Sequence, residues 1–210
     1  MDISKAKSLL KANYRPPAKR WDILNDCLEG FKTIVLIDGV FLEEYPPSPK
    51  EILTVIQQGT TVFGSSSMGA LRAVELRRVG MQGSGFVYRS YLNRHVVDDD
   101  EVAVTFNYDS GKAYSYALIN LRYTLGRLQE NKLLTEEEGQ SLFQFQKEIY
   151  FPFRTFSSLK YSCEEVFGLR GKVIFDLIKT NWIDIKALDA EVLLRSLATN
   201  SERGVLCLKN

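Results

Sequence analysis

Two short apolar runs, separated by one amphipathic stretch, define the first recognisable unit of the sequence. Thr33 to Ile37 is apolar almost without interruption, which is typical of a β-strand buried on both faces. Thr60 to Phe63 is a second run of β-branched and aromatic residues. Between them, Pro49 to Gln58 has the pattern of a helix, and Gly59 ends it. A strand, a helix and a second strand in this order predict a right-handed crossover and a parallel sheet.

The start of the intervening helix carries a signal of its own. Ser48 stands before Pro49, and Glu51 follows at the position of a capping box. Parallel strands expose their carboxyl ends at one edge of a sheet. We therefore expect Asp38-Gly39, after the first strand, and Gly64 to Ser67, after the second, to open on the same side.

Further helices are expected on both sides of this unit, with one more strand. The helical ranges are residues 5–14, 21–28, 71–78, 86–94 and 114–130, a helix starting at Thr135, and two or three more within residues 157–197. A short strand is expected at residues 102–106. The predicted fold is α/β: a small parallel-sheet core with crossover helices, followed by a mostly helical C-terminal half. We place the division at about residue 135, with a core of residues 1–135 and a helical extension of residues 136–210.

Composition narrows the class of protein. With 45% hydrophobic and 25% charged residues in a length of 210, the chain is an ordinary globular protein, and its net charge of +1 argues against a dedicated nucleic-acid surface. No apolar run reaches the roughly 20 residues that span a bilayer, and the N-terminal segment lacks the apolar core of a signal peptide. A cytoplasmic location without a membrane partner is therefore expected. One histidine and the widely spaced Cys27, Cys163 and Cys207 indicate neither a metal site nor a disulfide framework, and no cofactor is expected.

The segment with the richest chemistry is the turn from Gly64 to Ala70, hereafter the serine turn, which follows the second strand and opens a helix. Hydroxyls and glycines at a helix N-terminus supply backbone N–H groups, the positive end of the helix dipole and a candidate nucleophile. Ser65-x-Ser67-x-Gly69 is close to the nucleophile elbow G-x-S-x-G, with a serine in place of the first glycine. The single histidine, His95, precedes the acidic run, whereas the acid usually precedes the histidine in such triads, so the match to an α/β hydrolase is weak.

Other groups can support a serine at this edge. A serine is also activated by a lysine or held beside a carboxylate, and Lys50 and Asp38 are the candidates. The alternative is that the serines only cap the helix and close the turn. Arg72 is a nearby cation, although it lies three residues before Glu75 and can simply pair with it.

The acidic run Asp98 to Glu101 also has two interpretations. Several carboxylates in a row suit a hard divalent cation, but we expect a structural or partner-facing segment without a strong metal site. With an extended backbone, Asp99 and Glu101 would share one face and point toward the site. Asn120 and Arg122 lie two residues apart on their predicted helix and therefore face different ways.

Taken in order, these segments resemble the TfuA-like family. The motifs that carry the resemblance are I-D-G-x-F, K-E-I-L, G-x-S-S-M-G-A-L-R-A-x-E-L, G-M-x-G-x-G, D-D-D-E-V-A-V and N-x-R-x-T-L, and they stand here at residues 37–41, 50–53, 64–76, 80–85, 98–104 and 120–125. The match covers about residues 5–135. Family members usually begin with a further strand ending in G-P-S, so either the sheet has lost an edge strand or the start is shortened. Residues 140–210 match no motif of the family and are treated as a lineage-specific helical extension.

The resemblance implies a role in peptide-backbone thioamidation. TfuA-like proteins work beside an ATP-dependent YcaO-type enzyme that replaces a backbone amide oxygen of a precursor peptide with sulfur. Members are associated with hydrolysing the thiocarboxylated C-terminus of a ThiS-like sulfur carrier, which releases sulfide, and with helping the YcaO-type enzyme engage its peptide. The enzyme, the carrier and the peptide are thus the expected partners. Attack on a thiocarboxylate needs an oxyanion stabiliser and a hold on an anionic tail, and a serine-bearing helix N-terminus suits both.

The first of two functions that remain open is a hydrolase. In it, Ser66 or Ser67 acts as nucleophile or oxyanion donor, and Lys50, Asp38 and Arg72 are the other catalytic candidates. The serine turn and Asp38 are expected to border one pocket. The expected substrate-binding residues are Gly39, Gly64, Ser65, Met68, Gly69, Asp99, Glu101, Asn120 and Arg122.

The second function is a non-catalytic accessory that docks on the YcaO-type enzyme. Its candidate anchors are the aromatic residues Phe151, Phe153, Phe156 and Tyr161, unless these fill the core instead. The convergence of polar groups at one predicted sheet edge favours the hydrolase, since a purely structural interface is more apolar.

Overall fold

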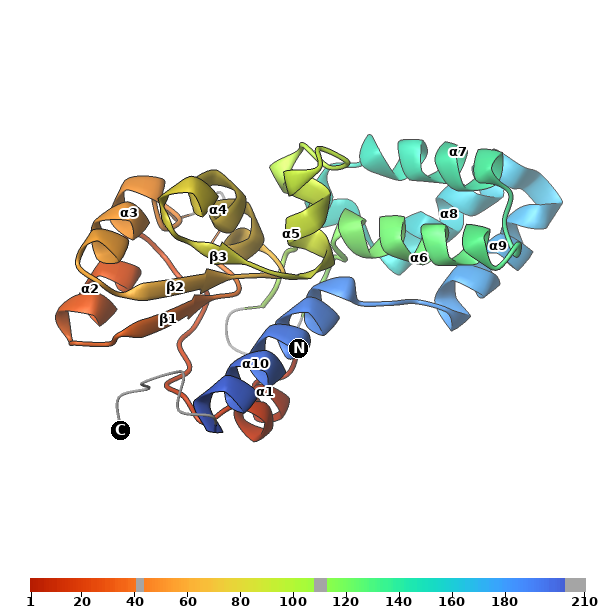
Figure 1. Ribbon diagram of the computed structural model, residues 1–210. Helices are drawn as coiled ribbons and strands as arrows, with labels where there is room; N and C mark the ends of the chain where they lie inside the picture. The colour runs from red at the N-terminus through yellow and green to blue at the C-terminus, as the bar shows by residue number, and fades with distance from the viewer. Residues whose placement is uncertain (41–43, 108–112, 203–210) are drawn as a thin grey trace. The chain divides into compact units, whose positions relative to one another are not determined.

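The computed structural model describes residues 1–40, 44–107 and 113–202, and the chain divides into two compact units (Figure 1). The first unit comprises Met1–Val97 together with the chain from Lys186 onward, and the second comprises Asp98–Ile185. The expected division at residue 135 rests on where the resemblance ends and stays a prediction.

The first unit is built on a three-stranded parallel sheet in the order β1-β2-β3. Its elements are α1 (Ile3–Leu9), α2 (Asp22–Leu28), β1 (Thr33–Leu36), α3 (Pro49–Gln57), β2 (Thr61–Gly64), α4 (Met68–Leu76), the 3-10 helix η1 (Arg77–Val79), β3 (Gln82–Gly83), α5 (Gly85–Leu92) and α10 (Ile185–Glu202). In register, Leu36 of β1 pairs with Gly64 of β2, and Gly64 pairs with Gly83 of β3. The predicted parallel sheet is confirmed. The third strand was not predicted, because two residues beside glycines show no strand pattern.

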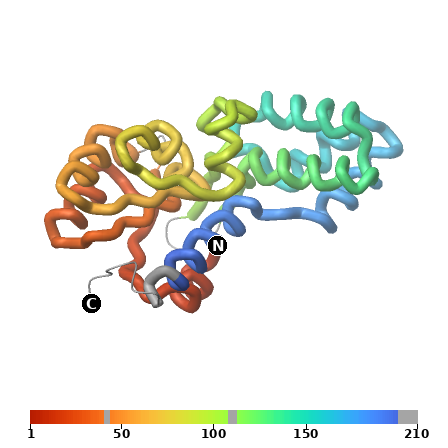
Figure 2. The backbone as a smooth tube through the Cα atoms, in the orientation of Figure 1, coloured from red at the N-terminus to blue at the C-terminus, as the bar shows by residue number. Residues whose placement is uncertain are grey.

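Helices cover both faces of this sheet, which explains why the first strand is apolar throughout. Helices α2, α3 and α4 pack on the face that carries Leu36 and Val62. The opposite face, with Val35 and Phe63, packs against a cluster formed by the leucines of α10 and the residues of α1, Ala6 among them. Figure 2 shows the C-terminal helix returning beside the first helix of the chain.

The second unit is helical. Its elements are η2 (Asp99–Glu101), α6 (Leu118–Glu130), α7 (Glu136–Lys147), η3 (Phe151–Phe153), α8 (Phe156–Phe167), η4 (Gly168–Arg170) and α9 (Gly171–Thr180). Its core is one cluster of buried residues, mainly leucine and isoleucine, from α6 to α9, against which Phe143 and Trp182 pack. The predicted capping boxes at Ser48 and Thr135 are both present, and the helical C-terminal half is confirmed.

The predicted strand at residues 102–106 is wrong. The acidic residues before it form the 3-10 helix η2, and the following residues are irregular, with Phe106 making only an isolated bridge to Ala113. Val102 and Ala103 are buried, so the apolar character of this segment reflects packing and not a place in a sheet. The first helix also ends at Leu9, earlier than residue 14. Within the described ranges, no helix is both long and apolar enough to cross a membrane.

Candidate functional site

The serine turn is packed tightly against the end of β1. The amides of Ser67 and Gly69 both donate to the Ile37 carbonyl at 3.3 Å, and the amide of Ser65 donates to the Leu36 carbonyl at 3.2 Å. A Cβ atom on Gly69 would lie 1.8 Å from the Leu36 carbonyl oxygen. The glycine is therefore needed for β1 and the start of α4 to approach so closely.

The second predicted segment, Asp38-Gly39, lies beside this turn. A Cβ atom on Gly39 would lie 3.0 Å from Cγ of Met68, the first residue of α4. The half-buried Asp38 accepts a hydrogen bond from the Gly39 amide at its own carboxylate, 3.0 Å away. The fold thus brings both strand ends to one edge, as expected. A shared pocket there stays a prediction. A shallow cleft near the start of α2, lined by Trp21 and Tyr45 among others, contains none of the expected site residues.

The three serines of the turn are all buried, but their hydroxyls differ. Ser65 Oγ donates to the Ser84 carbonyl at 2.9 Å and to the Asp189 carbonyl at 3.4 Å. Ser66 Oγ donates to the Lys186 carbonyl at 2.8 Å. The hydroxyl of Ser67 makes no hydrogen bond to any described residue and does not cap α4, although Ser67 is its N-cap residue.

Most of the first-turn amides of α4 are already engaged. The Ile37 carbonyl takes the amide of Gly69, and the Ser67 carbonyl takes the amides of Ala70 and Leu71. The amide of Met68 has no acceptor among the described residues. The Ser67 hydroxyl and the Met68 amide therefore both lack a hydrogen-bond partner among the described residues. A nucleophile elbow presents the same two groups, the serine hydroxyl and the amide of the next residue.

The backbone of Ser66 is strained. Its φ is +72°, in the left-handed region that residues with a Cβ atom rarely adopt. Such outliers cluster at functional sites and persist only where the surrounding structure holds them.

The two cationic candidates of this unit, Arg72 and Lys50, differ in whether they already bind other side chains. Arg72 donates to both carboxylate oxygens of Glu75, at 3.0 and 2.8 Å, and to the Pro47 carbonyl at 2.8 Å. The pairing with Glu75 that the sequence offered as an alternative is thus present. Lys50 lies exposed on the first turn of α3 and has no ion pair with a described residue.

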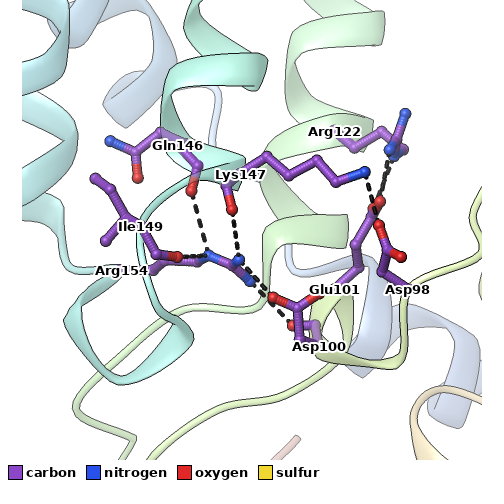
Figure 3. A network of polar contacts seen from close by, with 8 residues as sticks. All are labelled: Asp98, Asp100, Glu101, Arg122, Gln146, Lys147, Ile149 and Arg154. Carbon is purple, nitrogen blue, oxygen red and sulfur yellow. Dashed lines mark hydrogen bonds and ion pairs between the residues drawn. The ribbon is translucent and has the colours of Figure 1, made fainter.

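The acidic run belongs to the second unit, where it forms the network drawn in Figure 3. Asp98 pairs with Lys147 at 2.6 Å. Glu101, only 1% exposed, receives both Arg122 Nε and Nη2, at 2.9 and 2.7 Å. Arg122 also lies over the ring of Phe143, at 4.0 Å from its centroid. Because η2 is a 3-10 turn and not extended, the alternation expected for the run does not occur.

Arg154 completes this network and was missed at the level of sequence. Its guanidinium is 1% exposed, donates to the Asp100 carboxylate at 2.6 Å and to the Asp100 carbonyl at 3.0 Å. It also donates to the carbonyls of Gln146, Lys147 and Ile149 at the end of α7. A cation is favourable there because the last carbonyls of a helix lack internal partners.

The remaining predicted residues of the second unit have local partners or are exposed. Asn120 Nδ2 donates to the Asp184 carboxylate at 3.1 Å, in a different direction from Arg122, while Asp99 is exposed. Across the described part of the chain, no group of three or more histidine, cysteine or acidic residues is arranged to hold a metal ion. A role for these residues at the serine turn stays a prediction.

Asp189 is the second residue that sequence reasoning missed. Its carboxylate, 5% exposed, accepts the amides of Phe86 and Val87 at 2.7 and 2.8 Å. Burial raises the pKa of the Asp189 carboxyl above its usual range. The hydrogen bonds from the amides of Val87 and Phe86 act in the opposite direction and lower this pKa. The signal was available: Asp189 interrupts the apolar stripe of α10, four residues after Ile185 and four before Leu193.

Comparison with known proteins supports the family that the motifs indicate. No curated protein matches the sequence. A family model described as TfuA-like protein matches residues 38–155, more than half of the chain. The matched segment begins at Asp38, contains the whole serine turn and α4, and ends directly after Arg154. The chain therefore belongs to the TfuA-like family.

Proposed function

We propose that this protein hydrolyses the thiocarboxylated C-terminus of a ThiS-like sulfur carrier and delivers the sulfide to a YcaO-type enzyme for thioamidation of a precursor peptide. The reaction is R–C(=O)S⁻ + H2O → R–COO⁻ + HS⁻ + H⁺, so that the C–S bond breaks, a C–O bond forms and no oxidant or reductant is needed.

The observation that carries the proposal is the pair formed by the Ser67 hydroxyl and the Met68 amide. Among the serines of the turn, Ser67 is the one whose hydroxyl has no partner in the described residues. Attack of Ser67 Oγ on the thiocarboxylate carbon forms a tetrahedral oxyanion. The adjacent Met68 N–H is a donor for that oxyanion, as the amide after the nucleophile is in hydrolases with an elbow.

The later steps follow from the same groups. Collapse of the tetrahedral intermediate expels hydrosulfide and leaves an ester on Ser67, which water then hydrolyses to the carboxylate. Asp38, at the neighbouring strand end, is the candidate acceptor for the Ser67 proton, which it then donates to the sulfur so that the sulfur leaves as HS⁻. Lys50 is the better candidate for holding the anionic tail, because Arg72 already pairs with Glu75.

A specific observation also supports the accessory function as a second candidate. Phe153 and Tyr161 of the second unit are 67% and 57% exposed, and exposed aromatic side chains are frequent anchors of protein interfaces. Phe151 is buried, and Phe156 packs against Trp182 with ring centroids 4.9 Å apart, so these two serve the core. Docking on a YcaO-type enzyme and hydrolysis are compatible, since docking raises the local concentration of sulfide at its consumer.

The test is the initial rate of sulfide release from a thiocarboxylated carrier. We predict that Ser67→Ala lowers this rate by about tenfold or more, since loss of a nucleophile or an oxyanion donor typically costs ~10²-fold. Ser90→Ala is the matched control: Ser90 is also buried in the first unit, but its hydroxyl bonds to the Phe86 carbonyl of its own helix. A Ser67→Ala protein that folds and keeps the wild-type rate would contradict the assignment.

A further inference from the structure

The first turn of α10 contacts the serine turn through two hydroxyl groups. The carbonyl of Lys186 accepts Ser66 Oγ at 2.8 Å, and the carbonyl of Asp189 accepts Ser65 Oγ at 3.4 Å. These contacts join residues 120 and 124 positions apart in the sequence, within the same compact unit. The conformation of the turn thus depends on a helix from the far end of the chain.

The side chain of Asp189 fixes this turn of α10 to the start of α5. Ser84 is the N-cap residue of α5, but it makes no capping bond, and its buried hydroxyl has no partner within the described residues. The Asp189 carboxylate takes its place and accepts the amides of Phe86 and Val87. The fit is close, because a Cβ atom on Gly85 would lie 2.4 Å from the Asp189 carboxylate.

The contacts form a closed network. Ser65 Oγ, which reaches the Asp189 carbonyl, also donates to the Ser84 carbonyl at 2.9 Å. The Ser84 amide in turn donates to the Gly64 carbonyl at 3.1 Å, at the first residue of the serine turn. The start of α5, the first turn of α10 and the serine turn therefore hold one another.

The strained residue lies inside this network. Ser66 has a positive φ, and its hydroxyl donates a hydrogen bond to the Lys186 carbonyl that restrains its side chain. Ser67 follows directly, so the direction of its hydroxyl and of the Met68 amide depends on Ser66 keeping this conformation.

We infer that Asp189 is a positioning residue: by anchoring the first turn of α10 to α5, it holds the carbonyls that fix Ser65 and Ser66 and so orients Ser67. The catalytic consequence rests on the hydrolysis proposed above. The structural link between Asp189 and the serine turn can be measured without it.

The test is Asp189→Asn, which keeps the shape of the side chain but replaces one carboxylate oxygen with an NH2 group. That group cannot accept a hydrogen bond, so either the Phe86 or the Val87 amide loses its acceptor. We expect kcat for sulfide release to fall by about tenfold with KM changed less than about twofold, because displacement of an aligned group by a fraction of an ångström weakens the transition state more than binding. The Phe86 and Val87 amides should exchange with solvent faster than in the wild type. Glu191→Gln is the matched control, since it makes the same chemical change on α10 at a side chain that pairs with Lys5 and Arg195.

A second measurement separates this inference from the proposed function. The backbone φ of Ser66 is followed by NMR couplings and chemical shifts, and we expect its positive value to be lost or averaged in Asp189→Asn. A Ser66 that keeps its positive φ while Phe86 and Val87 lose protection would overturn the inference, as would an unchanged kcat. If the wild type releases no sulfide, the proposed function fails, and the φ comparison decides the inference alone.

Failure of Asp189→Asn to fold does not end the test. Ser65→Ala removes the hydrogen bond between the Ser65 hydroxyl and the Asp189 carbonyl by changing its donor. This substitution alters the core less than Asp189→Asn does. A Ser66 φ identical to that of the wild type in this variant would overturn the inference, and an averaged one would support it.

Discussion

At the scale of single residues, the glycines and serines of the turn are there for different reasons. Gly69 and Gly64 allow two backbones to approach, since a Cβ atom on Gly64 would lie 2.1 Å from the Gly69 carbonyl oxygen. Ser65 and Ser66 donate hydrogen bonds to backbone carbonyls, whereas the Ser67 hydroxyl makes none to the residues that the structure describes. The sequence shows the composition of the turn, but only the contacts separate these roles.

Gly69→Ala tests the close approach. The added Cβ atom has no space against the Leu36 carbonyl, so β1 and α4 must move apart, and we predict a loss of about 3 kcal/mol in the free energy of unfolding. Urea denaturation measures this loss. The control is Gly126→Ala in the middle of α6, where a Cβ atom meets nothing within 4 Å and alanine should stabilise the helix by about 0.5–1 kcal/mol. Equal stability of Gly69→Ala and the wild type would show that the turn is not tightly packed.

At the scale of elements, charged side chains from elsewhere in the chain complete helix ends. Asp189 caps the start of α5, and Arg154 binds three carbonyls at the end of α7 while pairing with Asp100. The acidic run is thereby tied to α6 and α7 through Arg122, Lys147 and Arg154. Three of its carboxylates, those of Asp98, Asp100 and Glu101, are thus paired with cations of the same unit.

Arg154→Met tests the second of these caps. The substitution leaves several buried carbonyls without donors, so we predict a loss of about 3 kcal/mol or more in the free energy of unfolding. The control is Arg127→Met, since Arg127 is half exposed and pairs with Glu130 on the surface of α6, a contact worth about 0.5 kcal/mol or less. Similar losses in both variants would mean that burial of the Arg154 contacts contributes little.

Local signals predicted the elements that depend on neighbouring residues. The capping boxes at Ser48 and Thr135 and the apolar strand at Thr33 are readable because cap, helix and strand lie within a few residues of one another. The strand expected at Val102 was wrong, because an apolar segment packs equally well as irregular structure. The contacts of Asp189 and Arg154 depend on distant parts of the chain, and periodicity alone does not reveal them.

At the scale of the whole molecule, the helical C-terminal part is not one appendage. Residues up to Ile185 belong to the second unit, whereas α10 belongs to the unit that holds the serine turn. A truncation at residue 150 would therefore remove α10 as well, and would disturb the site together with any docking surface. Surface substitutions separate the two functions more cleanly.

We predict that Phe153→Ser combined with Tyr161→Ser weakens binding to the YcaO-type enzyme by about tenfold or more, because exposed aromatic anchors dominate interface energy. Coupled thioamidation should fall in parallel, while sulfide release by this protein alone stays at the wild-type rate. Tyr45→Ser, which changes a 75% exposed tyrosine in the other unit, is the control for surface substitution. Undiminished binding of the double variant, measured by calorimetry, would place the docking surface elsewhere.

Hydrolysis of the carrier is the central claim, and the most direct test uses the wild-type protein alone. A ThiS-like carrier with a thiocarboxylated C-terminus is incubated with this protein in the absence of a YcaO-type enzyme, ATP and peptide, and intact-mass spectrometry follows the carrier over time. We predict conversion of the thiocarboxylate to the carboxylate with equimolar release of sulfide, at a rate proportional to the protein concentration. A carrier that stays thiocarboxylated for as long as it does in buffer would contradict the account.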